Sequence, residues 1–316
     1  MIRRKQFLMI IIVIAAFVSV PFVLDAENNY FIYYLFIAFT YLAIAQGFNL
    51  IAGYTGQVSL GQHAFFGLGA YVTVFAWELA GLEYFNPFAM ALSGLVPAIL
   101  AILIGIPLLS KLRGDYFSLG TLGLGEILRV IFIQGRAITG GSMGKYLPSA
   151  SYTSMFPYYF TALFLAVFST ALVFYIVRSR IGLALIAIRE DETAAAANGI
   201  HILLYKLFAF AVGAFITGLC GSLQAYFLFH VHPQNFFGLS WTLYPILMCV
   251  LGGSGSFIGP VIGAIVLTGV FELAKIWLPG IHPIISGTLI MAAILFLPDG
   301  LIRLKLRGIF RKRKIS

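Results

Sequence analysis

Long apolar runs recur along the whole chain and constrain its fold more than any other feature. Most of them are long enough to cross a hydrocarbon core of about 30 Å as a helix. The ten runs cover residues 7–24, 30–51, 64–79, 88–109, 116–133, 158–177, 207–231, 242–251, 257–278 and 281–297, and the eighth is too short to span as a regular helix. They predict an all-α polytopic membrane protein of about ten transmembrane helices, some of them discontinuous.

The composition agrees with this class and excludes others. Hydrophobic residues make up 61% of the 316 residues and charged residues only 10%, which is more apolar surface than a soluble core can bury. The formal net charge of +9 suggests nucleic-acid binding at first sight, but the basic residues lie in loops and in the tail, beside the apolar runs. Lipid headgroups and topology explain that placement, so we expect the bilayer, and no nucleic acid, as a partner.

The first run has features of both a signal peptide and a membrane span. Arg3, Arg4 and Lys5 precede it, as basic residues do in secretory signals. No convincing small-x-small cleavage site follows it, so we interpret it as a retained first span. Residues 1–316 then form a single transmembrane domain that ends in a basic tail, residues 298–316.

The distribution of Lys and Arg predicts the orientation of the chain. With ten crossings, both termini share a side with the segment around Lys111 and with Arg178–Lys206, and these places hold 16 of the 20 Lys and Arg residues. The positive-inside rule assigns them to the cytoplasm. The polar segment 135–157 and the segment around His230 are then expected to face outward.

The longest polar interruption, Arg178–Lys206, contains a predicted short helix over Asp191–Gly199. Acidic residues at 190–192 suit a helix start, four alanines follow, and Asn198-Gly199 supplies a C-cap. So short a helix is marginal by itself in water, so something must hold it. Two interpretations remain open here: a loop helix that rests on its own protein, and a docking helix for a separate soluble subunit.

Two glycine-rich stretches interrupt the apolar runs, one from Gly53 to His63 and one from Leu251 to Pro260. Irregular backbone at membrane depth is tolerated only where protein or a water-filled cavity satisfies it, so such breaks often mark a substrate path. Cytoplasmic turns remain the alternative for both. For the first stretch we favour a path lined by Gly53, Gln57, Ser59, Gly61, Gln62 and His63.

Few ionisable residues lie inside the runs, and small residues recur there. Glu126 and Arg129 lie one turn apart in the fifth run. A proton relay is one role for this intramembrane pair, but we expect a neutralising pair that orients neighbouring helices, since proton-coupled carriers usually show unpaired carboxylates at the midplane. Gly213, Thr217 and Gly221 recur every four residues and predict close helix packing.

The sequence lacks motifs for catalysis or metal binding. Residues 139–146 superficially resemble a phosphate-binding loop, but Thr139 replaces its first glycine and Tyr146 its metal-binding Ser or Thr. No Cys or His cluster has the spacing of a metal site. We therefore expect a chain that is not an enzyme and holds no metal or cofactor, and any ATP that powers it must bind another chain.

Five strings of residues, taken together, are far more specific than any one motif. They begin at Phe48 (FNLIAGYTGQVSLG), Leu122 (LGLGEILR), Thr139 (TGG), Ala187 (AIREDETAAAANG) and Leu251 (LGGSGSFIGPVIGA). These strings, which extend from residue 48 to residue 264, resemble LivM-type permeases. Such permeases are membrane subunits of bacterial ABC importers for branched-chain amino acids.

The resemblance implies a ten-span importer permease in a bacterial inner membrane, with a coupling loop at 178–206. Its implied partners are a LivH-like sister permease, two cytoplasmic ATPases and a periplasmic substrate-binding protein. The family's coupling motif maps onto Glu192, Ala194, Ala195 and Gly199, with one extra residue before the glycine. The implied cargo is leucine, isoleucine or valine; urea, short amides or other amino acids stay open, as does an ion-coupled secondary transporter.

Overall fold

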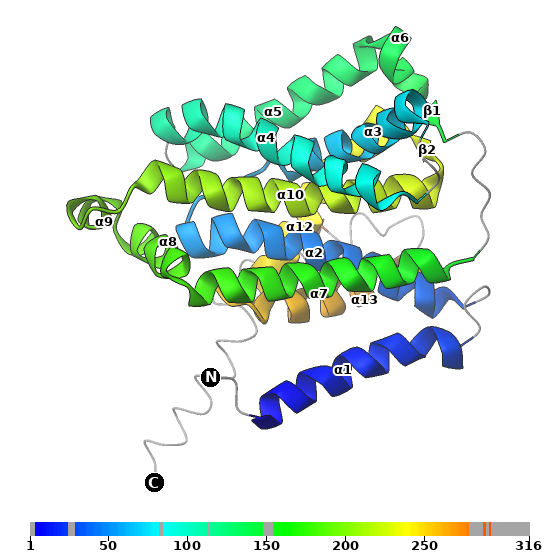
Figure 1. Ribbon diagram of the computed structural model, residues 1–316, viewed down its shortest axis with the longest axis horizontal. Helices are drawn as coiled ribbons and strands as arrows, with labels where there is room; N and C mark the ends of the chain where they lie inside the picture. The colour runs from blue at the N-terminus through cyan, green and yellow to red at the C-terminus, as the bar shows by residue number, and fades with distance from the viewer. Residues whose placement is uncertain are drawn as a thin grey trace.

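A computed structural model describes residues 4–24, 29–81, 85–112, 114–147 and 154–277, together with residues 287, 288 and 291. The described chain is helical apart from one two-stranded ladder (Figure 1). Its elements in chain order are α1 (Arg4–Val23), α2 (Tyr30–Thr55), α3 (Gln62–Ala80), α4 (Pro87–Lys111), α5 (Asp115–Gln134), α6 (Arg136–Thr139), the 3₁₀ helix η1 (Gly141–Met143), β1 (Lys145–Tyr146), α7 (Phe156–Arg178), α8 (Arg180–Glu190), α9 (Glu192–Ala197), α10 (Ile202–Leu228), β2 (His230–Val231), α11 (Pro233–Phe236), α12 (Ser240–Gly252) and α13 (Gly259–Trp277).

The long helices lie side by side, as membrane spans do (Figure 1). Seven stretches of the described chain are long and apolar enough to cross a membrane, and α1 contributes a shorter apolar helix, Ile12–Val23. The seven are α2, α4, α5, α7, α10, the stretch from α11 to the end of α12, and α13. The protein is therefore an all-helical polytopic membrane protein.

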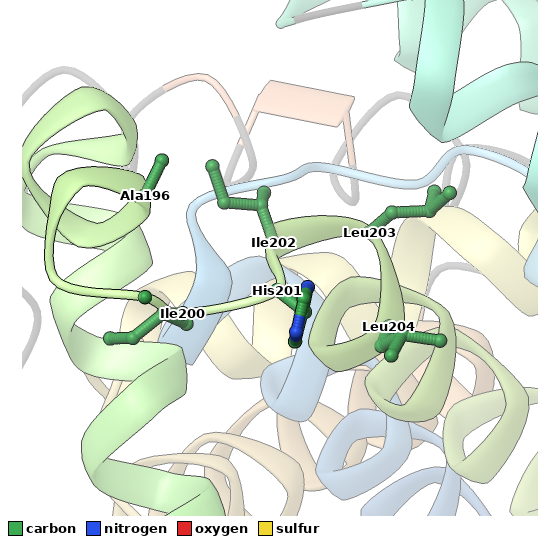
Figure 2. Close-up of a pocket in the computed structure, with 7 residues that line it drawn as sticks. Ala196, Ile200, His201, Ile202, Leu203 and Leu204 are labelled. Carbon is green, nitrogen blue, oxygen red and sulfur yellow. The ribbon is translucent and has the colours of Figure 1, made fainter.

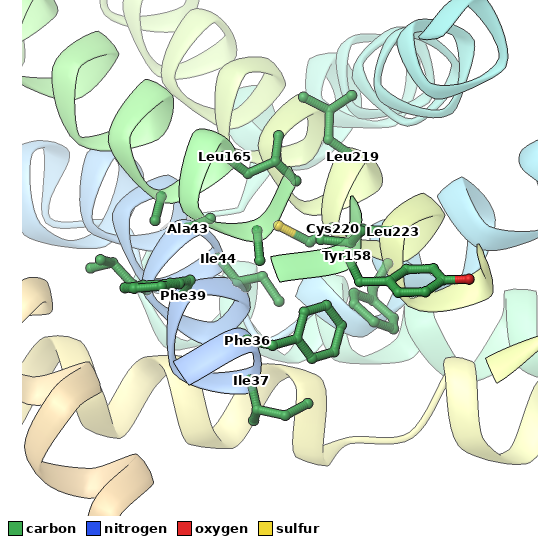
Figure 3. Packing of buried hydrophobic residues seen from close by; sticks show 14 of the residues in the cluster. Phe36, Ile37, Phe39, Ala43, Ile44, Tyr158, Leu165, Leu219, Cys220 and Leu223 are labelled. Atoms are coloured by element: carbon green, nitrogen blue, oxygen red, sulfur yellow. The ribbon is translucent and has the colours of Figure 1, made fainter. Parts of the chain in front are cut away.

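Helices α2 and α10 form the centre of the bundle. Helix α2 packs against α7, α10, α12 and α13, and α10 packs against α2, α3 and α4. Helix α1 lies at the edge, beside α7 (Figure 1). Figure 3 shows part of the buried core between α2, α7 and α10, where the labelled residues are Phe36, Ile37, Phe39, Ala43, Ile44, Tyr158, Leu165, Leu219, Cys220 and Leu223.

Small residues bring α10 close to its neighbours, as the four-residue spacing predicts. A Cβ atom on Gly47 of α2 would lie 3.1 Å from the carbonyl oxygen of Gly213. A Cβ on Gly218 would collide with the Ser93 carbonyl of α4, and one on Gly221 with the Phe66 carbonyl of α3. Close backbone contact of this kind is how helices associate in lipid, so the prediction of packing is confirmed.

The bundle has two distinct ends, which we name after α9 and β1 (Figure 1). The start of α1, the turn between α4 and α5, and helices α8 and α9 lie at the α9 end. At the β1 end, Lys145 pairs with Val231 and Tyr146 with His230 in an antiparallel ladder. The predicted outward segments therefore lie together, at the end opposite α9.

The predicted runs agree with the helices except at the first glycine break. Helix α12 has only 13 residues, so the short eighth run is confirmed. Helix α2 continues through Gly53 to Thr55, and α3 begins at Gln62, so the irregular backbone is confined to 56–61 rather than to the whole of 53–63. Gly56 ends α2 because it adopts a left-handed conformation, with φ +76°. The tenth run and the basic tail lie outside the described residues, apart from 287, 288 and 291.

Candidate functional site

Helix α5 provides hydrogen-bond partners for the backbone of the irregular segment between α2 and α3. The Ser118 hydroxyl donates to the Val58 carbonyl oxygen at 2.7 Å, and the Leu60 N–H donates to the Thr121 hydroxyl at 3.0 Å. A Cβ on Gly61 would lie 2.6 Å from the Thr121 carbonyl oxygen, so only glycine allows this approach. Backbone that has left the helix is thus satisfied by a neighbouring helix rather than by lipid.

The polar side chains predicted to line a path lie together here, and all are buried. The exposed fraction is 5% for Gln57 and 0% for Ser59, Gln62 and His63. The Thr217 hydroxyl of α10 donates to Gln62 Oε1 at 2.9 Å. Three of their polar atoms have no hydrogen-bond partner in the part of the chain that the structure describes: Gln57 Oε1, Gln62 Nε2 and His63 Nε2. A buried polar group without a hydrogen bond lowers the stability of the fold. These three atoms are therefore free to bond a ligand or water.

Polar residues of α2 hold the second break, residues 253–258, against the first. Asn49 Oδ1 accepts the Gly255 N–H at 2.9 Å, while Asn49 Nδ2 donates to the Ser256 carbonyl at 2.9 Å. Gln46 Nε2 donates to the Phe257 carbonyl at 2.8 Å. Sequence reasoning missed both α2 residues. The available signal was two polar residues three positions apart, hence on one face of an apolar helix.

Arg189, in the last turn of α8, joins the two breaks, because its stem lies beside Gly56, where a Cβ would be 3.5 Å from Arg189 Cγ, and its guanidinium reaches the second break. Its Nη1 atom donates to the Gly53 carbonyl oxygen at 2.5 Å. Gly255 lies against the same guanidinium, so that a Cβ there would collide with it, and φ of +75° also favours glycine. Sequence reasoning placed Arg189 in the coupling loop but assigned it no role. The contact links residues 136 positions apart, which no local pattern can indicate.

The predicted short helix is present as α9, with a cap at each end. Asp191 Oδ1 accepts the N–H groups of Thr193 and Ala194 at 2.7 and 3.0 Å, and these hydrogen bonds lower the pKa of the Asp191 carboxyl. At the other end the Ile200 N–H bonds the Ala195 carbonyl at 3.1 Å across Gly199, whose φ is +81°. This is a Schellman cap. Helix α8, which precedes α9 directly, was not predicted.

Glu192 connects α9 to the bundle. Its carboxylate forms an ion pair with Lys206 at the start of α10 and accepts a 3.3 Å hydrogen bond from Gln57 Nε2 of the first break. Lys206 is 2% exposed and Glu192 28%. Of the other residues in the coupling motif, Ala195 is buried against the protein, whereas Ala194 and Gly199 are exposed. The helix thus has one anchored face and one free face.

An open hollow of about 490 Å³ lies beside the free face of α9. Ala196 lines it together with residues 199–204, and Figure 2 shows these side chains around the turn that joins α9 to α10. Leu204 is 63% exposed there. A concave, largely apolar surface next to an exposed alanine helix can receive a protruding partner element.

The predicted intramembrane pair lies on an exposed face of α5. Arg129 Nη1 is 3.2 Å from Glu126 Oε2, and the side chains are 36% and 48% exposed. Within the described residues their hydrogen bonds join only each other. Both partners belong to one helix, so the pair joins no two helices among the described residues, and the expectation that it orients neighbouring helices stays a prediction.

Broken spans, a buried polar segment between them and a capped helix outside the bundle are the features of a membrane transport protein. The family comparison gives the particular kind, since residues 30–297 match the family described as branched-chain amino acid transport system / permease component. The chain belongs to this family of ABC transporter permeases.

Individual relatives agree with the family. Over 333 residues the chain is 29% identical to the high-affinity branched-chain amino acid transport system permease protein LivM of Salmonella typhimurium, which covers 95% of this chain and 75% of that protein. LivM of Escherichia coli is 28% identical over the same shares. LivH of Salmonella typhimurium is 26% identical over 290 residues, or 83% of this chain and 91% of that protein. No solved structure gives a significant match.

Proposed function

We propose that this chain is one of two membrane permease subunits of an ABC importer and forms the path for leucine, isoleucine or valine. The family and the LivM and LivH relatives support the cargo. The fold is the ten-span permease type. A LivH-like sister permease completes the path, two ATPase subunits supply the energy, and a periplasmic binding protein delivers the amino acid.

The α9 end is cytoplasmic and the β1 end faces the periplasm of an inner membrane. The excess of Lys and Arg in the termini and in 178–206 supports this orientation. The ATPase docks on the free face of α9 and in the hollow beside it, which is lined by Ala196 and residues 199–204. The binding protein docks at the opposite end, near β1 and β2.

The mechanism is alternating access driven through α9. Closure of the ATPases pushes α9, and the caps at Asp191 and Gly199 keep so short a helix intact as a lever. Glu192 passes the displacement to Gln57 and Lys206, and Arg189 passes it to Gly53 and Gly255. The observation that carries the proposal is this pair of side chains, which tie the coupling segment to both glycine breaks.

Reconstitution of the complete complex in liposomes tests the proposal. We expect leucine uptake that requires ATP, the ATPase subunits and the binding protein. Uptake by this chain alone under an ion gradient would instead establish a secondary carrier. Against that class, Glu78, Glu126 and Glu272, the carboxylates beyond the first turn of the long helices of the described chain, each have a basic partner. Competition by urea, short amides and other amino acids defines the cargo.

A further inference from the structure

The charged pair of α5 lies at the depth of the membrane. Glu126 is roughly 16 Å from the first residue of α5 and roughly 12 Å from the last, at 1.5 Å per residue. The apolar residues beside it, Ile127 and Val130, are 59% and 54% exposed. An ionised side chain facing hydrocarbon at this depth costs at least about 2.5 kcal/mol. Charged side chains in membrane helices almost always face the bundle interior or a water-filled cavity, even when they are paired, which favours a polar space rather than lipid beside Glu126 and Arg129.

A glycine leaves room beside the pair. Gly123 precedes Glu126 by three residues and so lies one turn away on the same side of α5. Apart from its chain neighbours and the backbone of α5 itself, no atom of the described residues lies within 4 Å of the position a Cβ would take at Gly123. A small ligand can thus approach the backbone of α5 directly next to the carboxylate.

Two nitrogen atoms, one in the pair and one in His63 beneath α5, lack hydrogen-bond partners among the described residues. Arg129 Nε and His63 Nε2 are both buried and unpaired. His63 lies under α5 at Gly125, where a Cβ would collide with its ring, and Arg129 follows Gly125 by four residues, hence on the same face. His63 is 0% exposed and lies close enough to feel the charges of both members of the pair.

The hydrogen bonds of His63 favour a donor aimed at α5. The His63 backbone N–H donates to the Thr242 hydroxyl at 2.8 Å, and that hydroxyl lies 2.9 Å from Nδ1 of the same ring. A hydroxyl oxygen that already accepts one hydrogen bond can give its own hydrogen to Nδ1. When the ring proton is on Nε2, this atom, which lies against Gly125 without a partner among the described residues, is a donor aimed at α5.

We propose that Glu126, Arg129 and His63 form a recognition site for the zwitterionic head of an amino acid inside the path. The ligand's ammonium group pairs with Glu126, and its carboxylate pairs with Arg129, whose guanidinium suits a carboxylate. His63 Nε2–H supports the carboxylate side, and Gly123 gives access. When no ligand is bound, Glu126 and Arg129 bond each other instead. This inference rests on the proposed function, since it names the feature of the cargo that this permease handles.

Protection of an engineered cysteine tests binding directly. Gly123→Cys places a thiol on the open side of the pair, while Cys220 and Cys249 are buried and give little background labelling. The complete complex is labelled with a water-soluble maleimide in the presence of leucine, leucinamide, which lacks the carboxylate, or 4-methylpentanoate, which lacks the ammonium group. We expect leucine to slow labelling at least fivefold and each analogue to do so less.

A variant that removes one charge of the pair should no longer distinguish leucine from the analogue that lacks the group bound by that charge. With Arg129→Gln, leucine and leucinamide should protect equally, and with Glu126→Gln, leucine and 4-methylpentanoate should. Lys275→Gln is the matched control, because Lys275 belongs to the other ion pair of this spacing, with Glu272 at the β1 end of α13. It should retain full discrimination, whereas a merely structural role for the α5 pair would lower protection by all three ligands together.

The outcomes separate this site from the proposed function. If the Gly123→Cys complex imports leucine but leucine does not protect the thiol, or if Arg129→Gln leaves the order of the three ligands unchanged, the zwitterion site is overturned and the importer stands. If the unmodified complex does not import leucine under ATP, the proposed function fails first.

Discussion

Arg189 donates a hydrogen bond of 2.5 Å to the carbonyl oxygen of Gly53 while its guanidinium lies against Gly255. One side chain at the end of α8 therefore contacts both glycine breaks. The same segment continues into α9 after a single residue, Asp191. Movement of α9 reaches both breaks without passing through the core of the bundle.

Replacement of Arg189 by Gln should uncouple ATP hydrolysis from uptake. A hydrogen bond to a charged group contributes about 1.5–3 kcal/mol, and about 1.4 kcal/mol corresponds to a factor of ten. We expect the leucine imported per ATP to fall roughly tenfold, with ATPase activity retained. Arg180→Gln is the control, because Arg180 is exposed on the same helix. Equal losses in both variants would rule out a specific role for Arg189.

Replacement of Gly199 by Val should distort the end of α9. A left-handed conformation costs a residue with a Cβ atom about 1–2 kcal/mol, and no atom lies within 4 Å of that Cβ position, so the effect is conformational rather than steric. Uptake should fall while membrane insertion persists. Gly81→Val imposes a similar strain at the end of α3, with φ +59°, and should leave coupling intact. Normal transport by the Gly199 variant would contradict the lever mechanism.

Replacement of Glu192 by Lys should be more damaging than replacement by Gln. Breaking a buried pair from one side costs about 3–5 kcal/mol, and we expect the lower end because Glu192 is 28% exposed. The change to Lys also places a like charge beside Lys206. Thermal unfolding and uptake both report the loss. The double variant Glu192→Lys/Lys206→Glu should recover stability; its failure to do so would argue against the ion pair as the anchor of α9.

Alanine at Gln57, Ser59, Gln62 and His63 tests whether the first break contributes to the path. Because three polar atoms of this group are buried without partners, we expect their removal to alter KM or the maximal rate of leucine uptake rather than to unfold the protein. Ser110→Ala, on the exposed surface of α4, is the control. Uptake kinetics unchanged in all four variants would remove the path hypothesis.

Cysteine labelling tests the orientation. Ala196→Cys lies on the free face of α9, and Met143→Cys lies at the β1 end, where Met143 is 80% exposed. A membrane-impermeant maleimide should label only the Met143 variant in whole cells and only the Ala196 variant in inside-out vesicles. Labelling of Ala196→Cys from the periplasm would reverse the topology and exclude docking of a cytoplasmic ATPase there.

The features that were predicted from sequence rest on local signals. The spans follow from runs of apolar residues, and α9 follows from Asp191 at its start and Asn198-Gly199 at its end. The extent of the first break was wrong because the prediction began it at the first glycine of the stretch, Gly53, whereas the helix continues to Thr55 and stops at the first left-handed glycine, Gly56.

The features that were missed depend on distant contacts. Asn49 bonds Gly255 and Ser256, which follow it by 206 and 207 positions, and Arg189 bonds Gly53, which precedes it by 136 positions. The outward position of Glu126 and Arg129 was missed for the same reason, since spacing places them on one face of α5 but cannot say which way that face points. Only the packing of α5 against the first break fixes it.

The ladder between β1 and β2 has a consequence for how the bundle can move. It fastens the chain just beyond α5 to the chain just beyond α10, through paired backbone and the stacked rings of Tyr146 and His230, whose centroids are 4.1 Å apart. A helix whose end is held in this way can rotate about that end but cannot move away from it. Any swing of α5 is then smallest at the β1 end of the bundle and largest at the α9 end.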